Sequence, residues 1–281
     1  MRVSINNEYD KLKSVVVCSA AYYNPDNLVL NNETIKYYAE NGGVPSREDI
    51  LKEQECFWEV LKKYNVNLLI ADLVEGAKGQ MFTRDLAFAI GNNFFISSMR
   101  KENRRLAING WKKIIDDIDD NIINVPSNVF LEGGDVVVDG NKVYVGISER
   151  TTMEGVEFLK SVLGNKYDVI PLKLKSKFLH LDVVFTIINP GLALVYKEGL
   201  EQDSYVLLND FEKILLNEDE QFKLGTNVFV IDRNHIIVNK DHVRLIQEIE
   251  KRGVNVIPVV FSETSKDGGA FRCTTCPLER G

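Results

Sequence analysis

The sequence lacks several features that mark large classes of protein. Only four cysteines occur among its 281 residues, too few for a disulfide scaffold in so long a chain, which favours reduced thiols. No run approaches the ~20 apolar residues that span a bilayer. The first residues, MRVSINNEYDKLKS, lack the apolar segment of a secretory signal. We therefore expect a cytoplasmic protein with no membrane partner.

Positive charge is also scarce. The chain carries 34 basic and 41 acidic side chains, a formal net charge of -7. Nucleic acid needs clustered Lys and Arg to neutralise its phosphates. The densest basic run, from Arg100 to Arg105, is interrupted by acid and predicts the solvated face of a helix. We therefore expect no nucleic-acid partner.

Common cofactor and metal motifs are missing too. The pairs Gly133-Gly134 and Gly268-Gly269 match neither the dinucleotide fingerprint nor the P-loop, and no serine lies in a G-x-S-x-G elbow. The chain has only three histidines, His180, His235 and His242. None of them is spaced as a metal-ligand pair. The sequence thus predicts no cofactor and no metal.

A repeated pattern is present instead: an apolar run, a tight polar turn and a second apolar run. Its four copies are DLAFAIGNNFFIS from Asp85, DVVVDGNKVYVG from Asp135, VVFTIINPGLALVY from Val183 and NVFVIDRNHIIVN from Asn227. Branched and aromatic residues around such turns are typical of β-hairpins. The turns recur at about 45 to 50 residues, a spacing expected of propellers and other repeat architectures.

Helical patterns and short strands follow most of these hairpins. We predict helices over residues 46–64, 100–118, 151–163 and 241–252, each followed by a strand, and Ser46 is the expected N-cap of the first.

A fifth hairpin forms only if FRCTTC (271–276) pairs with LKSVVVCS (12–19). The pattern predicts an α/β fold in which ββαβ modules close into a ring sealed by the chain ends. No linker rich in Pro, Gly or Ser divides the chain, so we expect residues 1–281 to form a single domain.

Polar residues stand at equivalent places where the hairpins begin. Asp85, Glu132 and Asp182 precede their turns by similar distances, so a ring of modules brings them together around one axis, with His180 and Cys273. Several carboxylates without enough histidines for a metal shell suit a delocalised organic cation such as a guanidinium. We predict an acidic cavity with one nucleophile and one proton-transfer group.

The histidine and the cysteines each have a simpler interpretation. His180 lies between two leucines, as many buried histidines do, but Asp182 follows two residues later on the same face of a strand. A nucleophilic cysteine needs such a histidine elsewhere in the fold. Cys273 and Cys276 form a C-x-x-C that leaves a redox pair open. We favour Cys273 as nucleophile and Cys276 as a small apolar residue.

Five blocks of sequence together resemble one family. They are FTRD (Phe82–Asp85), LEGGD (Leu131–Asp135), GISERT (Gly146–Thr151), HLD (His180–Asp182) and GGAFRCTTCPLER (268–280). In this order, across about two thirds of the chain, they resemble the guanidino-group-modifying enzymes of the pentein fold. That family includes arginine deiminases, dimethylarginine dimethylaminohydrolases, arginine dihydrolases and amidinotransferases.

The resemblance implies a five-module α/β propeller with pseudo-fivefold symmetry. It also implies a small-molecule guanidino substrate, a covalent intermediate on Cys273 and no cofactor. By the same resemblance, Asp85 and Asp182 grip the guanidinium, while Glu132 and His180 orient it and shuttle protons.

Other residues are candidates for substrate binding. Arg150, in the GISERT block, is suited to clamp a substrate carboxylate, because its planar fork matches that group. Arg84 lies in the FTRD block and is counted with it. The stretch from Ser19 to Asn32 is either a specificity loop or an ordinary surface loop, with Asn24 beside Tyr22 and Tyr23 as its candidates for substrate selection.

Two departures from the family leave the substrate open. Arg272 precedes Cys273 where the family often has histidine, and the chain is too short for the helical insertion of typical arginine deiminases. The sequence predicts a cysteine-dependent hydrolase acting on arginine or a methylated or related arginine. The alternatives are an amidinotransferase and a catalytically silent binding propeller like the ribosome anti-association factors. A homodimer remains open as the assembly.

Overall fold

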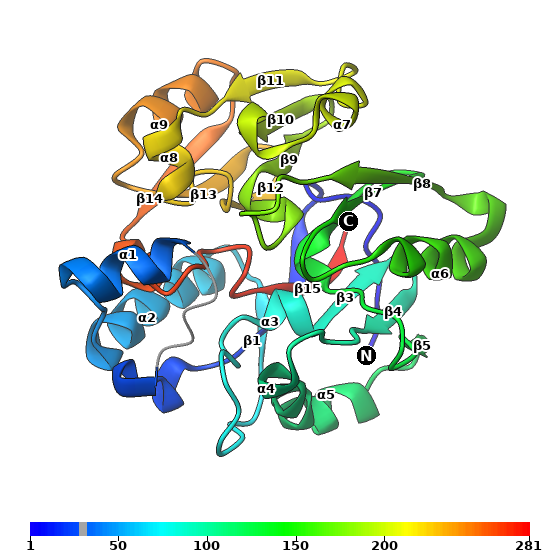
Figure 1. Ribbon diagram of the computed structural model, residues 1–281, viewed down its shortest axis with the longest axis horizontal. Coiled ribbons are helices and arrows are strands. Elements are labelled where there is room, and N and C mark those ends of the chain that lie inside the picture. The colour runs from blue at the N-terminus through cyan, green and yellow to red at the C-terminus, as the bar shows by residue number, and fades with distance from the viewer. Residues whose placement is uncertain (28–32) are drawn as a thin grey trace.

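The computed structural model describes residues 1–27 and 33–281, whose strands form five three-stranded sheets (Figure 1). The sheets are β15 (Cys276–Arg280), β1 (Leu12–Val17) and β2 (Asn67–Ile70); β3 (Ala87–Ile90), β4 (Asn93–Ile96) and β5 (Asn121–Asn124); β6 (Val136–Asp139), β7 (Lys142–Ile147) and β8 (Asp168–Lys173); β9 (Phe185–Asn189), β10 (Leu192–Val195) and β11 (Glu212–Leu215); and β12 (Phe229–Asp232), β13 (His235–Asn239) and β14 (Asn255–Val259).

All five sheets have the same topology. Two strands pair antiparallel, and a third strand pairs parallel with the second, as where Tyr144 of β7 faces Val137 of β6 and Ile170 of β8. The parallel pairing requires a crossover, and in each sheet that connection contains a helix. The predicted ββαβ modules and the four predicted hairpins are confirmed.

The chain ends share one sheet, but not through the residues expected. β1 pairs antiparallel with β15 through Val16 opposite Cys276 and Leu12 opposite Arg280, so the last strand begins where the predicted one ends. The residues before it turn instead, because the amide of Thr274 donates to the carbonyl of Ala270 at 3.1 Å. This correction places Cys273 in a tight turn rather than in a strand.

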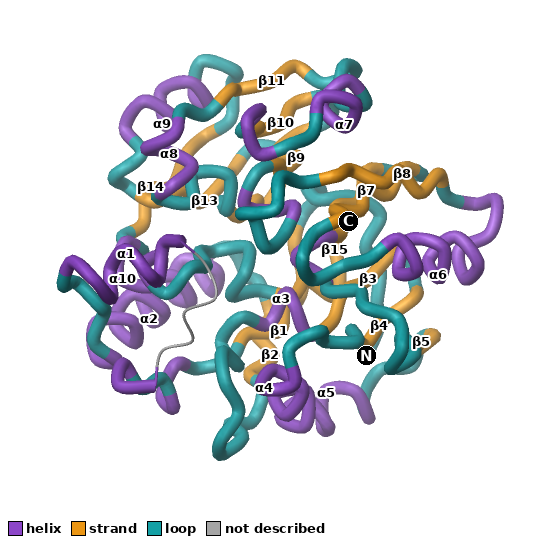
Figure 2. The backbone as a smooth tube through the Cα atoms, viewed as in Figure 1, coloured by secondary structure: helices purple, strands orange, loops and turns teal. Residues whose placement is uncertain are grey.

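The bounds of the helices are α1 (Glu33–Asn41), α2 (Arg47–Lys63), α3 (Thr83–Leu86), α4 (Glu102–Arg105), α5 (Lys112–Asp116), α6 (Met153–Leu163), α7 (Gln202–Val206), α8 (Glu218–Phe222), α9 (Val243–Glu250) and α10 (Ser262–Lys266). The longer helices α2, α6 and α9 lie toward the outside of the molecule, whereas the short α3 lies near its middle (Figure 2). Ser46 caps α2 as predicted, accepting a hydrogen bond from the amide of Asp49.

The predicted helix over residues 100–118 is not continuous. A 3-10 segment, Leu106–Trp111, separates α4 from α5. A side chain at Gly110 would place its Cβ 2.1 Å from the carbonyl oxygen of Asp72, and the two backbones hydrogen-bond there at 2.8 Å. The glycine therefore lets this segment pack directly on the loop after β2, where a regular helix with side chains has no room.

The apolar core follows the first two strands of each sheet, whose side chains are almost all buried. Phe57 of α2 packs edge-on against Phe229, Phe261 and Phe271, and so joins α2 to the segment before Cys273. Across the described residues, every helix is too short or too polar to cross a bilayer.

Candidate active site

A cavity of about 1340 Å³ opens where the first strands of the hairpins begin. Five of the predicted site residues line it together: Asn24, Asp85, Arg150, His180 and Cys273. Glu132 and Asp182 have no solvent-exposed surface and lie in contact with these residues. The structure therefore brings the predicted acids, histidine and cysteine to one place.

Short helical turns aim these side chains. Asp85 lies in α3, Glu132 precedes a 3-10 turn at Gly133–Asp135, and His180 precedes another at Leu181–Val183. A Cβ at Gly134 would lie 2.8 Å from Cγ of His180 and 2.9 Å from Oδ1 of Asp85. Glycine at this position is what lets the histidine approach both acids.

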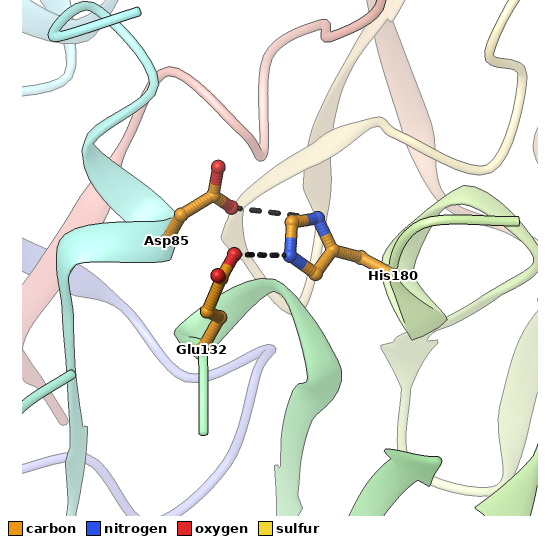
Figure 3. Close-up of side chains that lie close together, drawn as sticks. All are labelled: Asp85, Glu132 and His180. Atoms are coloured by element: carbon orange, nitrogen blue, oxygen red, sulfur yellow. Dashed lines mark hydrogen bonds and ion pairs between the residues drawn. The ribbon is translucent and has the colours of Figure 1, made fainter. Parts of the chain in front are cut away.

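The imidazole of His180 lies between two carboxylates (Figure 3). Its Nε2 is 2.9 Å from Oε2 of Glu132, and its Nδ1 is 3.6 Å from Oδ1 of Asp85. Burial alone would lower the pKa of His180, but the charge of Asp85 and the hydrogen bond and charge of Glu132, with Asp135 behind, raise it to about 10. His180 is thus an imidazolium, a proton donor, at neutral pH.

The two carboxylates are themselves held by cations and backbone. Oε1 of Glu132 accepts from the amide of Arg100 at 3.1 Å, and its Oε2 lies 3.4 Å from Nη1 of Arg150. Oδ2 of Asp85 accepts from Nη1 of Arg104 at 3.1 Å. Oδ1 of Asp85, although buried, accepts no hydrogen bond from any described residue. This oxygen lies 3.6 Å from Nδ1 of His180 and keeps the capacity to accept a hydrogen bond from a further donor.

Asp85, Glu132 and His180 also satisfy the geometry of a metal site among the described residues. One donor atom from each lies within 4.8 Å of the others. A protonated imidazole between two carboxylates supplies the positive charge that such a cluster needs. The donors fit an ion only after His180 loses its proton, so we derive no step through a metal.

Cys273 is 5% exposed and lies beside an acid and an amide. Its Sγ is 3.7 Å from Oδ2 of Asp182 and accepts a hydrogen bond of 3.1 Å from Nδ2 of Asn227. Burial, with the charges of Asp182 and Asp85, raises the pKa of the thiol well above its usual value, against smaller opposite effects from hydrogen bonds. The free site therefore holds a thiol, and a cation is needed to favour the thiolate.

Asn227 and Asp135 are site residues that the sequence reasoning missed. Oδ1 of Asn227 accepts from the amides of Ala270 and Cys273, at 3.2 and 3.1 Å. Oδ1 of Asp135 accepts from the amide of Leu181 at 2.8 Å, beside His180, and burial raises the pKa of Asp135 to about 7. Both stand where a hairpin begins, so extending the comparison of hairpin starts to the fourth module would have found Asn227.

The arginines do not all lie where the sequence suggested. Arg104 is buried, lines the cavity and binds Asp85, so the prediction that the run 100–105 forms a solvated face is wrong at this position. Arg150 lines the cavity, but it pairs with Glu132. Arg84 lies behind Cys273: its amide donates to the Cys273 carbonyl at 3.1 Å, and its Nε lies 3.5 Å from the Arg272 carbonyl.

The stretch predicted as a specificity loop reaches the cavity. Tyr22, Tyr23 and Asn24 line it, and Asn24 accepts a hydrogen bond from the amide of Asp26 at 2.9 Å. The end of that stretch, residues 28–32, lies outside the described residues. Cys276 faces away from the cavity, is fully buried and donates to the carbonyl of Ala87 at 3.1 Å.

Comparison with known proteins places the chain among relatives along nearly its whole length. Residues 24–280 match the family described as N,N dimethylarginine dimethylhydrolase, eukaryotic. The chain is also 36% identical over 279 residues to an uncharacterized protein, YkgA, of Bacillus subtilis strain 168, covering 98% of this chain and 94% of that protein.

Solved structures share the fold at lower identity. SxtG, an amidinotransferase from Microseira wollei in saxitoxin biosynthesis, aligns with a TM-score of 0.84 and 19% identity over 99% of this chain and 97% of its own. The product-bound N-terminal domain of ArgZ, a cyanobacterial arginine dihydrolase, aligns with a TM-score of 0.85 and 20% identity over 96% and 98%. Both proteins therefore share the fold of this chain along nearly its whole length.

Proposed function

The chain belongs to the N,N dimethylarginine dimethylhydrolase family of guanidino-modifying pentein enzymes, and from that premise we propose that it hydrolyses a guanidino C–N bond of a methylated arginine or of arginine itself through a covalent intermediate on Cys273. One observation carries the proposal. Cys273 and His180 line one cavity, where a hydrogen-bond-free oxygen of Asp85 and the carboxylate of Asp182 provide sites for a cation.

The first step forms a bond between sulfur and carbon. A guanidinium bound at Asp85 and Asp182 neutralises the charges that oppose ionisation of Cys273, so the thiol loses its proton to solvent. The thiolate then adds to the guanidinium carbon and gives a neutral tetrahedral adduct. His180, already an imidazolium, donates its proton to the departing amine as the C–N bond breaks. A cationic thiouronium remains on Cys273.

The second step reverses the roles. Neutral His180, held by Glu132, takes a proton from water while the oxygen adds to the same carbon. The C–S bond then breaks and releases a thiolate, which takes back from solvent the proton that it lost in the first step. The amine released in the first step accepts the proton that the product urea gives up, so atoms and charges balance.

The carboxylates are needed because the substrate carbon carries positive charge both on binding and in the thiouronium. Arg150 pairs with Glu132 and Arg104 pairs with Asp85, and each arginine offsets part of the negative charge of its carboxylate. We propose Arg150 also as partner of the substrate's α-carboxylate, since its Nε is buried without a hydrogen-bond partner in the described part of the chain and its side chain lines the cavity.

Product identification tests the proposal. The protein is incubated with arginine, monomethylarginine, asymmetric dimethylarginine and agmatine, and the products are resolved by mass spectrometry. We expect citrulline and an alkylamine from a methylated arginine, with Cys273→Ser inactive. Citrulline and ammonia from arginine alone would make the protein a deiminase, and ornithine with two ammonia a dihydrolase. Full turnover by Cys273→Ser would overturn the scheme.

Amidino transfer is the second candidate. The cavity volume exceeds the ~1,000 Å³ upper range of sites for one small molecule, which leaves room for an amine acceptor beside an amino acid. Products that appear only after an amine such as glycine is added would favour transfer over hydrolysis. Both reactions use the same Cys273 intermediate and differ in whether water or an amine attacks it.

Four broader expectations belong to the same proposal. We propose that the five modules close into a pseudo-fivefold propeller, that residues 1–281 form one catalytic domain, that the protein is cytoplasmic, and that it needs no cofactor. A homodimer is the assembly we would test first by light scattering.

A further inference from the structure

A buried arginine lies directly behind Cys273. Arg272 is 2% exposed, and its Nη1 and Nη2 donate to the two carboxylate oxygens of Glu8, the latter at 3.3 Å, while Nη2 also donates to the carbonyl of Val136 at 2.7 Å. Its Nε donates to no described residue and lies 3.6 Å from Oδ2 of Asp182. One guanidinium therefore stands between two carboxylates, the second of which touches the thiol.

Glu8 is built to hold a charge at this place. It is 5% exposed, and its Oε1 also accepts from the amide of Val138 at 3.2 Å. Burial acts to raise its pKa, but the charges of Arg272, Arg84 and Arg280 and the hydrogen bond from Arg272 lower it to about 2. Glu8 is consequently ionised at neutral pH and pairs with Arg272 there.

The bound substrate and Arg272 present the same chemical group to Asp182. A guanidinium free to move would close the 3.6 Å gap to Asp182, make a direct hydrogen-bonded pair with it and compete with the substrate cation. Without any guanidinium nearby, a carboxyl with no exposed surface favours its neutral form. Asp182 needs a cation close by, but not in contact.

We infer that Arg272 is a positioning residue, which Glu8 holds close enough to Asp182 to favour its ionised form and still leaves the outer face of Asp182 to a substrate guanidinium. The inference rests on the proposed function, because it assigns Asp182 to substrate binding. It also explains an N-terminal acid and an arginine that the proposed chemistry does not otherwise use.

The charged groups that face Asp182 come from several elements. They are Arg272 and Cys273 from the C-terminal turn, His180 from its own segment, Asp85 and Arg84 from α3. The pKa of Asp182 is raised, because burial, with a smaller effect of Asp85, outweighs the charges of Arg272, His180 and Arg84 that lower it; Arg272 is the largest of these opposing charges. Changing Arg272 leaves the other four in place, and changing Glu8 removes none of the five.

The two halves of the pair make opposite predictions for the pH dependence of kcat/KM. Arg272→Gln removes the cation, so the acid limb moves to higher pH and KM rises about 10-fold, with a smaller effect on kcat. Glu8→Gln frees Arg272 to pair with Asp182, so KM also rises but the acid limb moves to lower pH. Arg272→Lys keeps the charge and returns the limb toward that of the wild type. An acid limb of kcat/KM that stays at the wild-type pH in both Arg272→Gln and Glu8→Gln would overturn the inference.

A measurement without substrate separates this inference from the proposed reaction. Iodoacetamide alkylation of Cys273 is followed by peptide mass spectrometry, with exposed Cys56 as internal standard. Because Arg272 interacts electrostatically with Cys273, losing the negative charge of Glu8 should speed alkylation several-fold at pH 8, and losing the charge of Arg272 should slow it.

Asp10→Asn is the matched control. It removes one negative charge from the same N-terminal segment, at a partly exposed carboxylate that pairs with Arg233, and should leave alkylation unchanged. Equal rates in Glu8→Gln and Asp10→Asn would refute the positioning role even if turnover is found. If the alkylation rates change as expected but no guanidine is turned over, the proposed function is wrong and the effect of Glu8 and Arg272 on Cys273 is still supported. If Glu8→Gln does not fold, the Arg272→Gln and Arg272→Lys pair decides alone.

Discussion

Nδ2 of Asn227 donates a 3.1 Å hydrogen bond to Sγ of Cys273, while Oδ1 of the same amide accepts from the Cys273 backbone at 3.1 Å. One side chain therefore fixes both the sulfur and the turn that presents it. Its donor also favours the thiolate, whose pKa is otherwise raised by burial and neighbouring acids. Asn227 comes from the start of the fourth hairpin, so the nucleophile is supported by a neighbouring module.

The first prediction concerns this amide. Asn227→Asp replaces the donor with a charge, so we expect alkylation of Cys273 to slow and kcat/KM to fall by about 100-fold, the cost of one charge-sensitive hydrogen bond in a buried site. Asn189→Asp is the control, because Asn189 ends the third module's first strand and its side chain donates to the Arg233 carbonyl. Similar losses in both variants would assign the effect to general destabilisation.

A second prediction follows from the raised pKa of His180. Its folded pKa of about 10 exceeds the ordinary 6.5, so the imidazolium contributes stability that is fully present below pH 6.5 and is lost as the pH rises toward 10. Urea unfolding of the wild type should therefore show a loss of a few kcal/mol, as an order of magnitude, between pH 6.5 and 10.

His180→Asn provides the comparison. It has no proton to lose in that range, so its unfolding free energy should change less with pH over the same interval. Activity of the wild type should likewise decline on the alkaline side as His180 loses the proton that it donates to the departing amine. A variant that loses stability with pH as steeply as the wild type would contradict the assignment of this shift to His180.

The sequence predicted the modules because their signals are local. Apolar runs flanking turns such as Asp-Gly-Asn and Asn-Pro-Gly predict hairpins within about a dozen residues, and hairpins of similar pattern then place Asp85, Glu132 and Asp182 at equivalent positions. Arg104 was misplaced for the complementary reason. Its burial depends on Asp85, a partner 19 residues away in the chain, and a basic run looks solvated until that partner is known.

The contact of Glu8 could not be predicted from local sequence patterns. Glu8 lies 264 residues from Arg272 in a short polar stretch with no motif around it, so only the pairing of β1 with β15 reveals the contact. The predicted start of the last strand was wrong for a similar reason. The turn at Cys273 is held by hydrogen bonds from the backbone amides of Ala270 and Cys273 to Oδ1 of Asn227, and local sequence propensity does not reveal them.

The third prediction uses the close approach at Gly134. A Cβ there would lie 2.8 Å from Cγ of His180, so Gly134→Ala must displace the imidazole or Asp85. We expect kcat to fall at least about 10-fold, because misplacement by a fraction of an ångström disrupts proton transfer.

Gly140→Ala gives the opposite pattern and serves as control. Gly140 turns between β6 and β7 with φ of 63° and open space around it, so alanine there should lower stability by about 1 kcal/mol and leave kcat unchanged. Unchanged kcat in Gly134→Ala would mean that His180 does not need its present position between Asp85 and Glu132.

The last prediction separates a nucleophile from a redox pair. Cys276 is fully buried in β15 and donates to the Ala87 carbonyl, so Cys276→Ala should lower the unfolding free energy by about 1 to 2 kcal/mol while turnover per folded molecule persists. Cys273→Ala should abolish turnover with little change in stability, because its side chain lines a cavity. Incubation with dithiothreitol should leave the wild-type rate unchanged. Loss of activity in Cys276→Ala at full stability would mean that both sulfurs take part, and the C-x-x-C would then have to be treated as one functional unit.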